Sequence, residues 1–103
     1  MDKGDYVLAT KYNDGDPKDH FCIGLYDGKL FTRDGVETDR HMIVDSDGKL
    51  FRANGFRRCQ KVSDANRALF ANNVQLLEKC SASIWYWYYH PKQFQELVQD
   101  MQR

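Results

Sequence analysis

The sequence predicts an α+β fold in one domain that covers residues 1–103. Residues 3–62 are expected to form a small antiparallel β-barrel of five to six short strands, and residues 63–103 a helix–strand–helix extension. Three observations support this fold class. Short alternating segments separated by turn residues fill the first two-thirds of the chain, and the apolar period then becomes helical. The chain is also long enough to bury a core without metals or disulfide bonds.

Two strands are predicted near the start of the chain, over residues 5–12 (DYVLATKY) and 20–26 (HFCIGLY). Apolar residues alternate with other residues in both segments. The polar residues 13–19 (NDGDPKD) are expected to form the turn between them. Residues 27–39 are rich in turn formers, so we expect a long, mobile connection there.

A third strand is predicted over residues 40–45 (RHMIVD), and residues 45–48 (DSDG) are typical of a tight turn. Two further segments, 49–53 (KLFRA) and 56–61 (FRRCQK), flank Asn54-Gly55. This dipeptide is the strongest short signal for a two-residue hairpin turn. We therefore expect a hairpin at this point of the chain.

That hairpin would place Arg52 directly opposite Arg57 on one face. Two facing guanidinium groups repel each other, so an anion is expected close to them. The anion is either a phosphate of a ligand or an internal carboxylate. The loop 13–19, which we call the acidic loop, offers three such carboxylates, on Asp14, Asp16 and Asp19.

The last third of the chain is predicted to begin with one helix over residues 63–80, whose first residue is a good N-cap. Residues 83–89 (SIWYWYY) are predicted to form a strand. Aromatic residues favour the pleated surface, and the segment is too short for a stable isolated helix. In that strand Trp85, Trp87 and Tyr89 share one face.

Such a strand has two aromatic faces and needs two apolar neighbours. The barrel or the first helix is expected to cover one face and a closing helix the other, which leaves indole and phenol groups at the rim for a protein partner. Pro91 suits the first turn of the closing helix. Its apolar residues recur at helical spacing: Phe94, Leu97, Val98 and Met101. A helix this short is marginal in water on its own, so its apolar residues must be buried against other residues. We expect them to pack on the same chain rather than on a second copy.

Charge and cysteine content exclude several classes of protein. The chain has 15 Lys and Arg and 15 Asp and Glu residues, so bulk attraction to nucleic acid is absent. Residues 1–28 are nevertheless mainly acidic and residues 40–61 mainly basic. The three cysteines form no C-x-x-C pair, which favours reduced thiols over a zinc ribbon or a disulfide framework. No segment has the character of a signal peptide or a membrane span, so a soluble cytoplasmic protein is expected.

Two candidate reactive clusters lack essential members. The oxygen-rich loop 13–19 has neither the glycine nor the bidentate glutamate of an EF-hand, so turn formation explains its residues. His20 and Cys22 would point to one face of a strand, but no third group orients the imidazole. We therefore expect no metal, no cofactor and no enzymatic activity, and a hydrolase using His20 or Cys22 remains the third hypothesis.

The opening segment, KGDYVLATKYNDGDPKDHFCIGLY, resembles the first hairpin of Tudor-type and other SH3-like barrels. It has Gly4-Asp5, a strand ending in Ala-x-x-Tyr, an acidic turn and an aromatic-led second strand. RHMIVDSDG and FRRCQKVS are similar to the third strand and the exit of that fold. The resemblance covers about residues 3–62 and implies an SH3-like barrel. In such a barrel a short 3₁₀ turn can replace the hairpin at Asn54-Gly55.

The whole chain also resembles small uncharacterised proteins carried by bacteriophages, in the segments GDYVLATKY, DGDPKDHFCIG, FRANGFRRC and SASIWYWYYH. This resemblance implies a viral accessory protein that acts in the cytoplasm of a bacterial host. It brings no catalytic residues with it.

The expected function is that of a non-enzymatic interaction module that binds and modulates a host protein, such as part of a defence or nucleic-acid-processing system. The alternative is nucleic-acid binding, with basic residues of 52–61 on phosphates and an aromatic ring stacked on a base. The candidate binding residues for the two functions are Arg52, Phe56, Arg57, Arg58, Lys61, Tyr12, Trp85 and Trp87.

Overall fold

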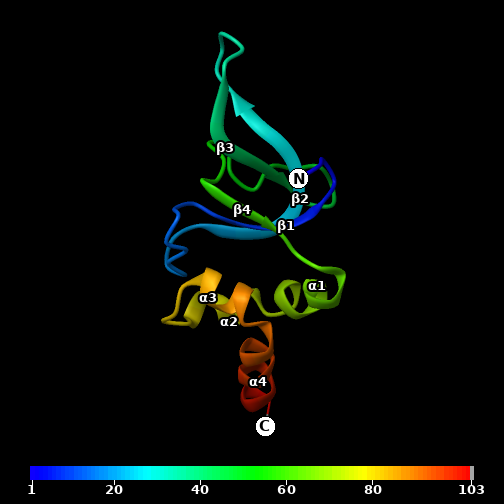
Figure 1. The fold of residues 1–103 in the computed structure, drawn as a ribbon, viewed down its shortest axis with the longest axis vertical. Helices are drawn as coiled ribbons and strands as arrows, with labels where there is room; N and C mark the ends of the chain where they lie inside the picture. Colours follow the sequence, from blue (N-terminus) through cyan, green and yellow to red (C-terminus); the bar gives the residue numbers. More distant parts are fainter. Residues whose placement is uncertain (103) are drawn as a thin grey trace.

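The structure of the protein is a computed structural model that describes residues 1–102. An antiparallel sheet packs on a layer of helices, which is the predicted α+β class (Figure 1). The four strands are β1 (Tyr6–Thr10), β2 (Phe21–Phe31), β3 (Glu37–Val44) and β4 (Arg58–Lys61). The four helices are α1 (Asp64–Ala71), α2 (Val74–Lys79), α3 (Ile84–Tyr89) and α4 (Pro91–Met101).

The strands form one sheet in the order β3-β2-β1-β4, and every neighbouring pair is antiparallel. Within residues 1–102 the sheet is open and has four strands, where a barrel of five or six was expected, and β3 and β4 are its edges. A bridge between His41 and Phe56 brings the segment before β4 onto the edge of β3. The sheet is therefore curled, although its edge strands are not joined as a ladder.

The two faces of the sheet are buried by different parts of the chain, because successive residues of β1 point to opposite sides. The core on the helical side consists of Leu8, Val62, Phe70, Leu77, Ile84, Trp85, Phe94 and Val98. The core on the other side, inside the curl, consists of Val7, Ala9, Cys22, Tyr26, Ile43, Phe56 and Cys59. β1 thus contributes to two separate cores.

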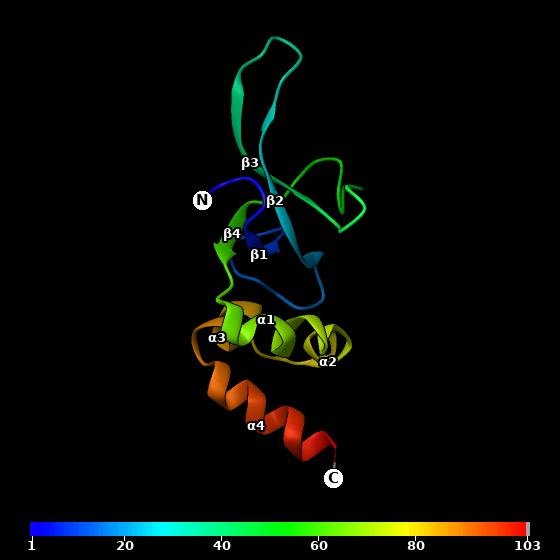
Figure 2. The same cartoon turned by 90° about the vertical axis from the view of Figure 1, so that its right-hand side faces the viewer.

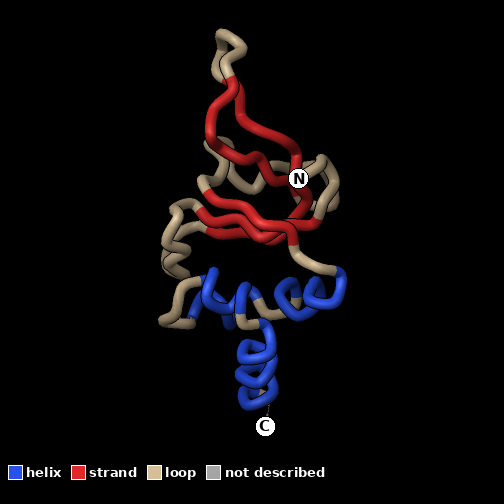
Figure 3. The backbone as a smooth tube through the Cα atoms, viewed as in Figure 1, coloured by secondary structure: helices blue, strands red, loops and turns tan. Residues whose placement is uncertain are grey.

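The molecule is elongated, with principal extents of 53 × 24 × 20 Å. The hairpin formed by β2 and β3 projects from one end and α4 projects from the other, as two perpendicular views show (Figure 1, Figure 2). Figure 3 shows the strands and helices as two layers, with α4 extending away from both. The tip of the hairpin and the end of α4 therefore lie at opposite ends of the molecule.

Residues 84–89 form helix α3, so the predicted strand was wrong. Ser83 caps the helix by accepting a hydrogen bond from the N–H of Trp85 (3.1 Å). The N–H of Ile84 donates to the carbonyl of Gly15 (2.8 Å). These contacts occupy N–H groups that the start of a helix leaves unpaired. The β-propensity of aromatic residues is a context-dependent preference, and tertiary contacts override it here.

The helix predicted over 63–80 is broken at Asn72 and Asn73 into α1 and α2. The side chain of Asn73 donates to the backbone carbonyl four residues earlier (2.7 Å), so it competes with the backbone for a helical acceptor. Phe70 of α1 and Leu77 of α2 are both buried, so the two short helices still direct apolar residues into the core.

Residues 27–39 extend the sheet instead of forming a mobile connection. β2 runs to Phe31 and β3 begins at Glu37, with irregularities in the ladder between them. At the tip the N–H of Thr32 donates to the Val36 carbonyl (2.9 Å), and the Val36 N–H donates to the Thr32 hydroxyl (3.1 Å). The turn formers of this segment therefore mark a closed hairpin tip.

The two-residue hairpin predicted at Asn54-Gly55 is also absent from the described residues. Residues 49–53 contribute one isolated bridge, made by Leu50, and Gly55 closes a turn by donating its N–H to the Arg52 carbonyl (3.0 Å). A Cβ at Gly55 would lie 2.8 Å from a backbone carbonyl of β3. A glycine is thus needed at this position because the turn packs closely against β3. Since the hairpin is absent, the predicted pairing of Arg52 with Arg57 was wrong.

The predicted closing helix is confirmed as α4, with Pro91 in its first turn. Phe94 is fully buried, and its ring stacks on Phe70 (centroids 5.5 Å) and tilts against Trp87 (5.6 Å). The helix is docked on its own chain through this ring. Met101, expected in the buried stripe, is exposed because the end of α4 extends beyond the helical layer.

Gly15→Ala is expected to lower the free energy of unfolding by about 3 kcal/mol. Gly15 has a φ of +68°, and its added Cβ would lie 2.5 Å from Trp85 Cδ1. Gly35→Ala is the matched control, because Gly35 has a φ of +80° with open space around its Cβ position. Urea unfolding should show a loss of about 1–2 kcal/mol in this control. Equal losses in the two variants would contradict the close packing of Gly15 on Trp85.

Phe94→Ala is expected to lower the free energy of unfolding by about 3–5 kcal/mol, because it removes a fully buried ring between Phe70 and Trp87. Met101→Ala on the same helix should change it by less than about 0.5 kcal/mol, since Met101 is 66% exposed. Thermal unfolding followed by circular dichroism measures both. Unchanged stability of Phe94→Ala would mean that α4 is not docked in solution.

Candidate functional site

The basic residues that were predicted to share one hairpin surface are separated in the structure. The guanidinium of Arg58 lies 4.3 Å from the centre of the Trp85 ring, on the helical side of the sheet. It donates to the carbonyl of Asn13 (3.0 Å) and to the hydroxyl of Tyr89 (3.4 Å). Arg58 therefore connects the sheet to the acidic loop and to α3.

The other members of the predicted surface also differ in their surroundings. Arg57 is exposed, and the exposed Lys61 side chain forms an ion pair with the partly buried Asp5 (3.8 Å). Phe56 is buried inside the curl, so its ring cannot stack on a base. Tyr12 is exposed beneath a lysine ammonium group (5.0 Å). Phe56 is therefore excluded from any basic and aromatic surface that these residues could form.

The aromatic segment contributes mainly to the core, as predicted. Trp85 is 3% exposed, and its Nε1 donates to the Thr10 hydroxyl (3.0 Å). Trp87 is partly buried, and its side chain lies close enough to the Cys80 thiol to oppose the rise that burial causes in the pKa of that thiol. The outward positions of α3 are occupied by Tyr86 and Tyr89. The two tryptophans are therefore not the exposed rim that a protein partner would contact.

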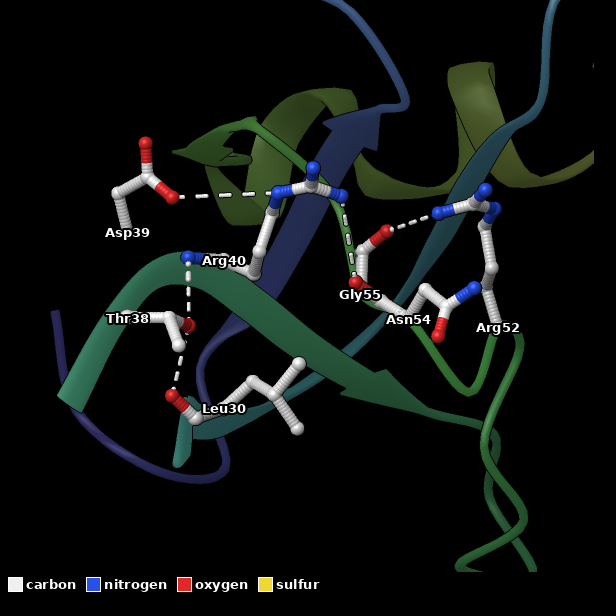
Figure 4. A network of polar contacts seen from close by, with 7 residues as sticks. All are labelled: Leu30, Thr38, Asp39, Arg40, Arg52, Asn54 and Gly55. Atoms are coloured by element: carbon white, nitrogen blue, oxygen red, sulfur yellow. Dashed lines mark hydrogen bonds and ion pairs between the residues drawn. The ribbon is translucent and has the colours of Figure 1, made fainter. Parts of the chain in front are cut away.

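The structure brings together two arginines that the sequence did not pair. Arg40 of β3 donates from Nη1 to the Asn54 carbonyl (3.5 Å), and Arg52 donates from Nη1 to the Gly55 carbonyl (2.8 Å). Figure 4 shows both guanidinium groups directed toward this turn. They line an open hollow of about 530 Å³ between the β2–β3 hairpin and the 52–55 turn. We name it the two-arginine hollow, and its lining residues are Leu30, Thr38, Asp39, Arg40, Arg52 and Asn54.

One hydroxyl group positions Arg40 on the hairpin. The Thr38 Oγ1 donates to the Leu30 carbonyl on β2 (2.7 Å) and accepts a hydrogen bond from the N–H of Arg40 (3.2 Å). Thr38 therefore joins the two strands where the ladder is irregular, two residues before the arginine (Figure 4). Arg52 is held independently, by the turn that follows it.

The positive charge of the hollow is only partly compensated. Arg40 faces Asp39 at 3.9 Å, but the Asp39 side chain is 85% exposed, so water screens this pair strongly. Arg52 forms no ion pair within the described residues. The acidic loop was a predicted partner for Arg52, but it instead accepts a hydrogen bond from Arg58 through the backbone carbonyl of Asn13. Sequence reasoning missed Arg40 because its hydrogen-bond partner lies 14 residues away.

The tip of the β2–β3 hairpin carries two exposed apolar side chains. Phe31 is 55% exposed and Val36 is 61% exposed. Their backbone is ordered by the hydrogen bonds of Thr32, so the pair sits on a structured projection. In the sequence the two residues flank a turn, and this position could have identified them.

The predicted cysteine nucleophile is placed in the core. Cys22 is 5% exposed, and burial together with the neighbouring Cys59 raises the pKa of its thiol. Burial likewise raises the pKa of Cys59 to about 12. A reactive cysteine needs a stabilised thiolate, whereas these thiols are held protonated. The environment of Cys22 therefore disfavours nucleophilic chemistry, while His20 is exposed.

The acidic loop is held together by its own backbone. The Asp14 and Asp16 carboxylates accept hydrogen bonds from the N–H groups two residues ahead (3.3 Å and 2.9 Å). Ser83 donates to the Asp14 carbonyl, which ties the loop to the start of α3. In residues 1–102 no group of three or more His, Cys, Asp or Glu side chains is placed to hold a metal ion.

Comparison of the chain with models of protein families, with curated proteins and with solved structures finds no match. Over the described part of the chain, no helix has both the length and the apolar character needed to cross a membrane.

Protonation of His41 is expected to destabilise the protein in mild acid. Burial lowers the pKa of His41 and nearby Lys29 lowers it further, while Asp39 opposes the shift. Its Nδ1 contacts the Tyr26 hydroxyl (3.2 Å). The unfolded chain binds this proton more tightly, so stability is full above the unfolded pKa of about 6.5 and is lost as the pH falls below it.

The stability of the wild type and of His41→Gln should be compared between about pH 7 and pH 5, where carboxylates contribute little. The variant should lose less stability over this range. His20→Gln, at an exposed position, is the matched control and should follow the wild type. A parallel pH profile of His41→Gln and the wild type would exclude this role of His41.

Proposed function

We propose that the chain is a non-enzymatic interaction module that binds a protein partner through the β2–β3 hairpin. The observation that carries the proposal is the exposure of Phe31 and Val36 on an ordered projection. Contiguous exposed apolar surface marks protein interaction sites, and an ordered hairpin tip can present such a surface to a partner. The hairpin also lies at one end of an elongated molecule, where a partner can reach it from several sides.

The resemblance of the sequence to bacteriophage proteins supports a partner from the bacterial host. The chain would then be an accessory protein in the host cytoplasm that modulates its partner, with defence and nucleic-acid-processing systems as the candidate classes. We further infer that residues 3–62 are an open relative of the SH3-like barrel. The curl that joins His41 to Phe56 supports this inference.

Capture from a bacterial lysate tests the proposal. The immobilised protein should retain one stoichiometric partner reproducibly, and the double variant Phe31→Ser, Val36→Ser should lose most of it. Met101→Ser is the matched control, because it removes an exposed apolar side chain at the opposite end of the molecule. Absence of a reproducible partner, or equal capture by the tip variant, would contradict the proposed function.

A further inference from the structure

The two-arginine hollow has hydrogen-bonding capacity that its internal contacts do not use. A guanidinium group has five N–H donors. Arg52 commits one nitrogen to the Gly55 carbonyl. Arg40 commits one nitrogen to the Asn54 carbonyl and directs a second toward Asp39. Both arginines therefore retain donors for an external acceptor.

The charge of the hollow also calls for an external anion. Two arginines and one aspartate line it, which leaves one positive charge in excess. Asp39 is mostly in water, whereas the Arg40 side chain is only 29% exposed and Arg52 is partly buried. Partly buried like charges raise each other's electrostatic energy, and a bound anion would relieve this cost.

We propose that the two-arginine hollow binds the carboxylate of an Asp or Glu side chain in the protein partner. This proposal rests on the proposed function, because it names the chemistry of the partner. A carboxylate is planar and carries a single charge, which matches the planar guanidinium donors and the one excess positive charge. Leu30 lines the same hollow, so an acidic residue beside apolar residues fits it best.

A nucleic-acid phosphate backbone fits the same surface less well. Binding of a phosphate backbone relies on several cationic side chains along its path. The lining of the hollow supplies only two cations, Arg40 and Arg52, which is too few to follow a strand. Arg58 is engaged with Trp85, and Lys61 with Asp5. An isolated pair of arginines with one excess positive charge is complementary to a single carboxylate.

The test is a titration of the ¹⁵N-labelled protein with short poly-L-glutamate at low ionic strength. Amide resonances of Thr38–Arg40 and Asn54–Gly55 should shift, and the shifts should diminish as salt is added. Arg40→Gln and Arg52→Gln should each weaken binding about tenfold, which corresponds to about 1.4 kcal/mol for a charged hydrogen bond. Arg57→Gln is the matched control, since Arg57 is an exposed arginine outside the hollow.

Arg52→Lys adds a variant that keeps the charge but removes the planar fork, and it should bind more weakly than the wild type. The amide spectra report directly whether each variant is folded. Absence of shifts at the hollow, or binding unchanged in the double variant Arg40→Gln, Arg52→Gln, would overturn the proposal. Shifts caused by single-stranded oligothymidylate but not by poly-L-glutamate would overturn it in favour of nucleic acid.

This titration is independent of lysate capture. If poly-L-glutamate binds and no partner is captured, the anion site stands and the proposed function fails. If a partner is captured equally by the wild type and by the arginine variants, and poly-L-glutamate does not bind, the module stands without the anion site.

Discussion

The contacts of one indole ring join the sheet to the helical layer. The Nε1 of Trp85 donates to Thr10 on β1, the guanidinium of Arg58 on β4 covers its face, and the backbone of Gly15 packs against its edge. The hydrogen bond is buried, so removing the Thr10 hydroxyl leaves the indole N–H without an acceptor, whereas Thr10 itself also donates to the Tyr12 carbonyl (2.7 Å). Three distant segments of the chain are thus positioned by the same side chain, and their contacts support one another.

This arrangement explains why the binding surface lies where it does. The helices cover the face of the sheet that bears Leu8, and the curl covers the face that bears Val7. Neither layer reaches the far half of the β2–β3 hairpin, which extends beyond both cores (Figure 1). The two-arginine hollow forms at the junction, where the hairpin leaves the curled part of the sheet and meets the 52–55 turn (Figure 4).

Periodicity predicted β1, the first half of β2 and α4, because their apolar residues alternate between the faces of the sheet or recur at helical spacing. It failed for the segment 84–89, since five consecutive aromatics have no period and the deciding contacts come from Gly15 and Ser83. A turn was predicted correctly at Asn54-Gly55, but the strand that pairs with the residues after the turn was not. The bridge of Phe56 to His41 joins residues that no local pattern connects.

The candidate site was the least predictable part of the molecule. Arg52 was identified from its sequence neighbours, but the arginine that lines the same hollow is Arg40 and not Arg57. The proximity of the two arginines depends on how β3 lies against the 52–55 turn, and the arrangement of the whole sheet determines that. Phe31 and Val36 are exposed because the β2–β3 hairpin extends beyond the layers that bury the rest of the sheet. How far it extends cannot be read from the composition of the chain.

The position of the hairpin tip outside both cores has an evolutionary consequence. Substitutions at exposed surface positions usually change stability by no more than about 0.5 kcal/mol. The exposed side chains of Phe31 and Val36 can therefore vary while Trp85 and its contacts keep the fold unchanged, whereas Thr32 and Gly35 preserve the backbone of the turn. A protein built in this way can follow a partner that changes its own surface, because recognition and folding are governed by different residues.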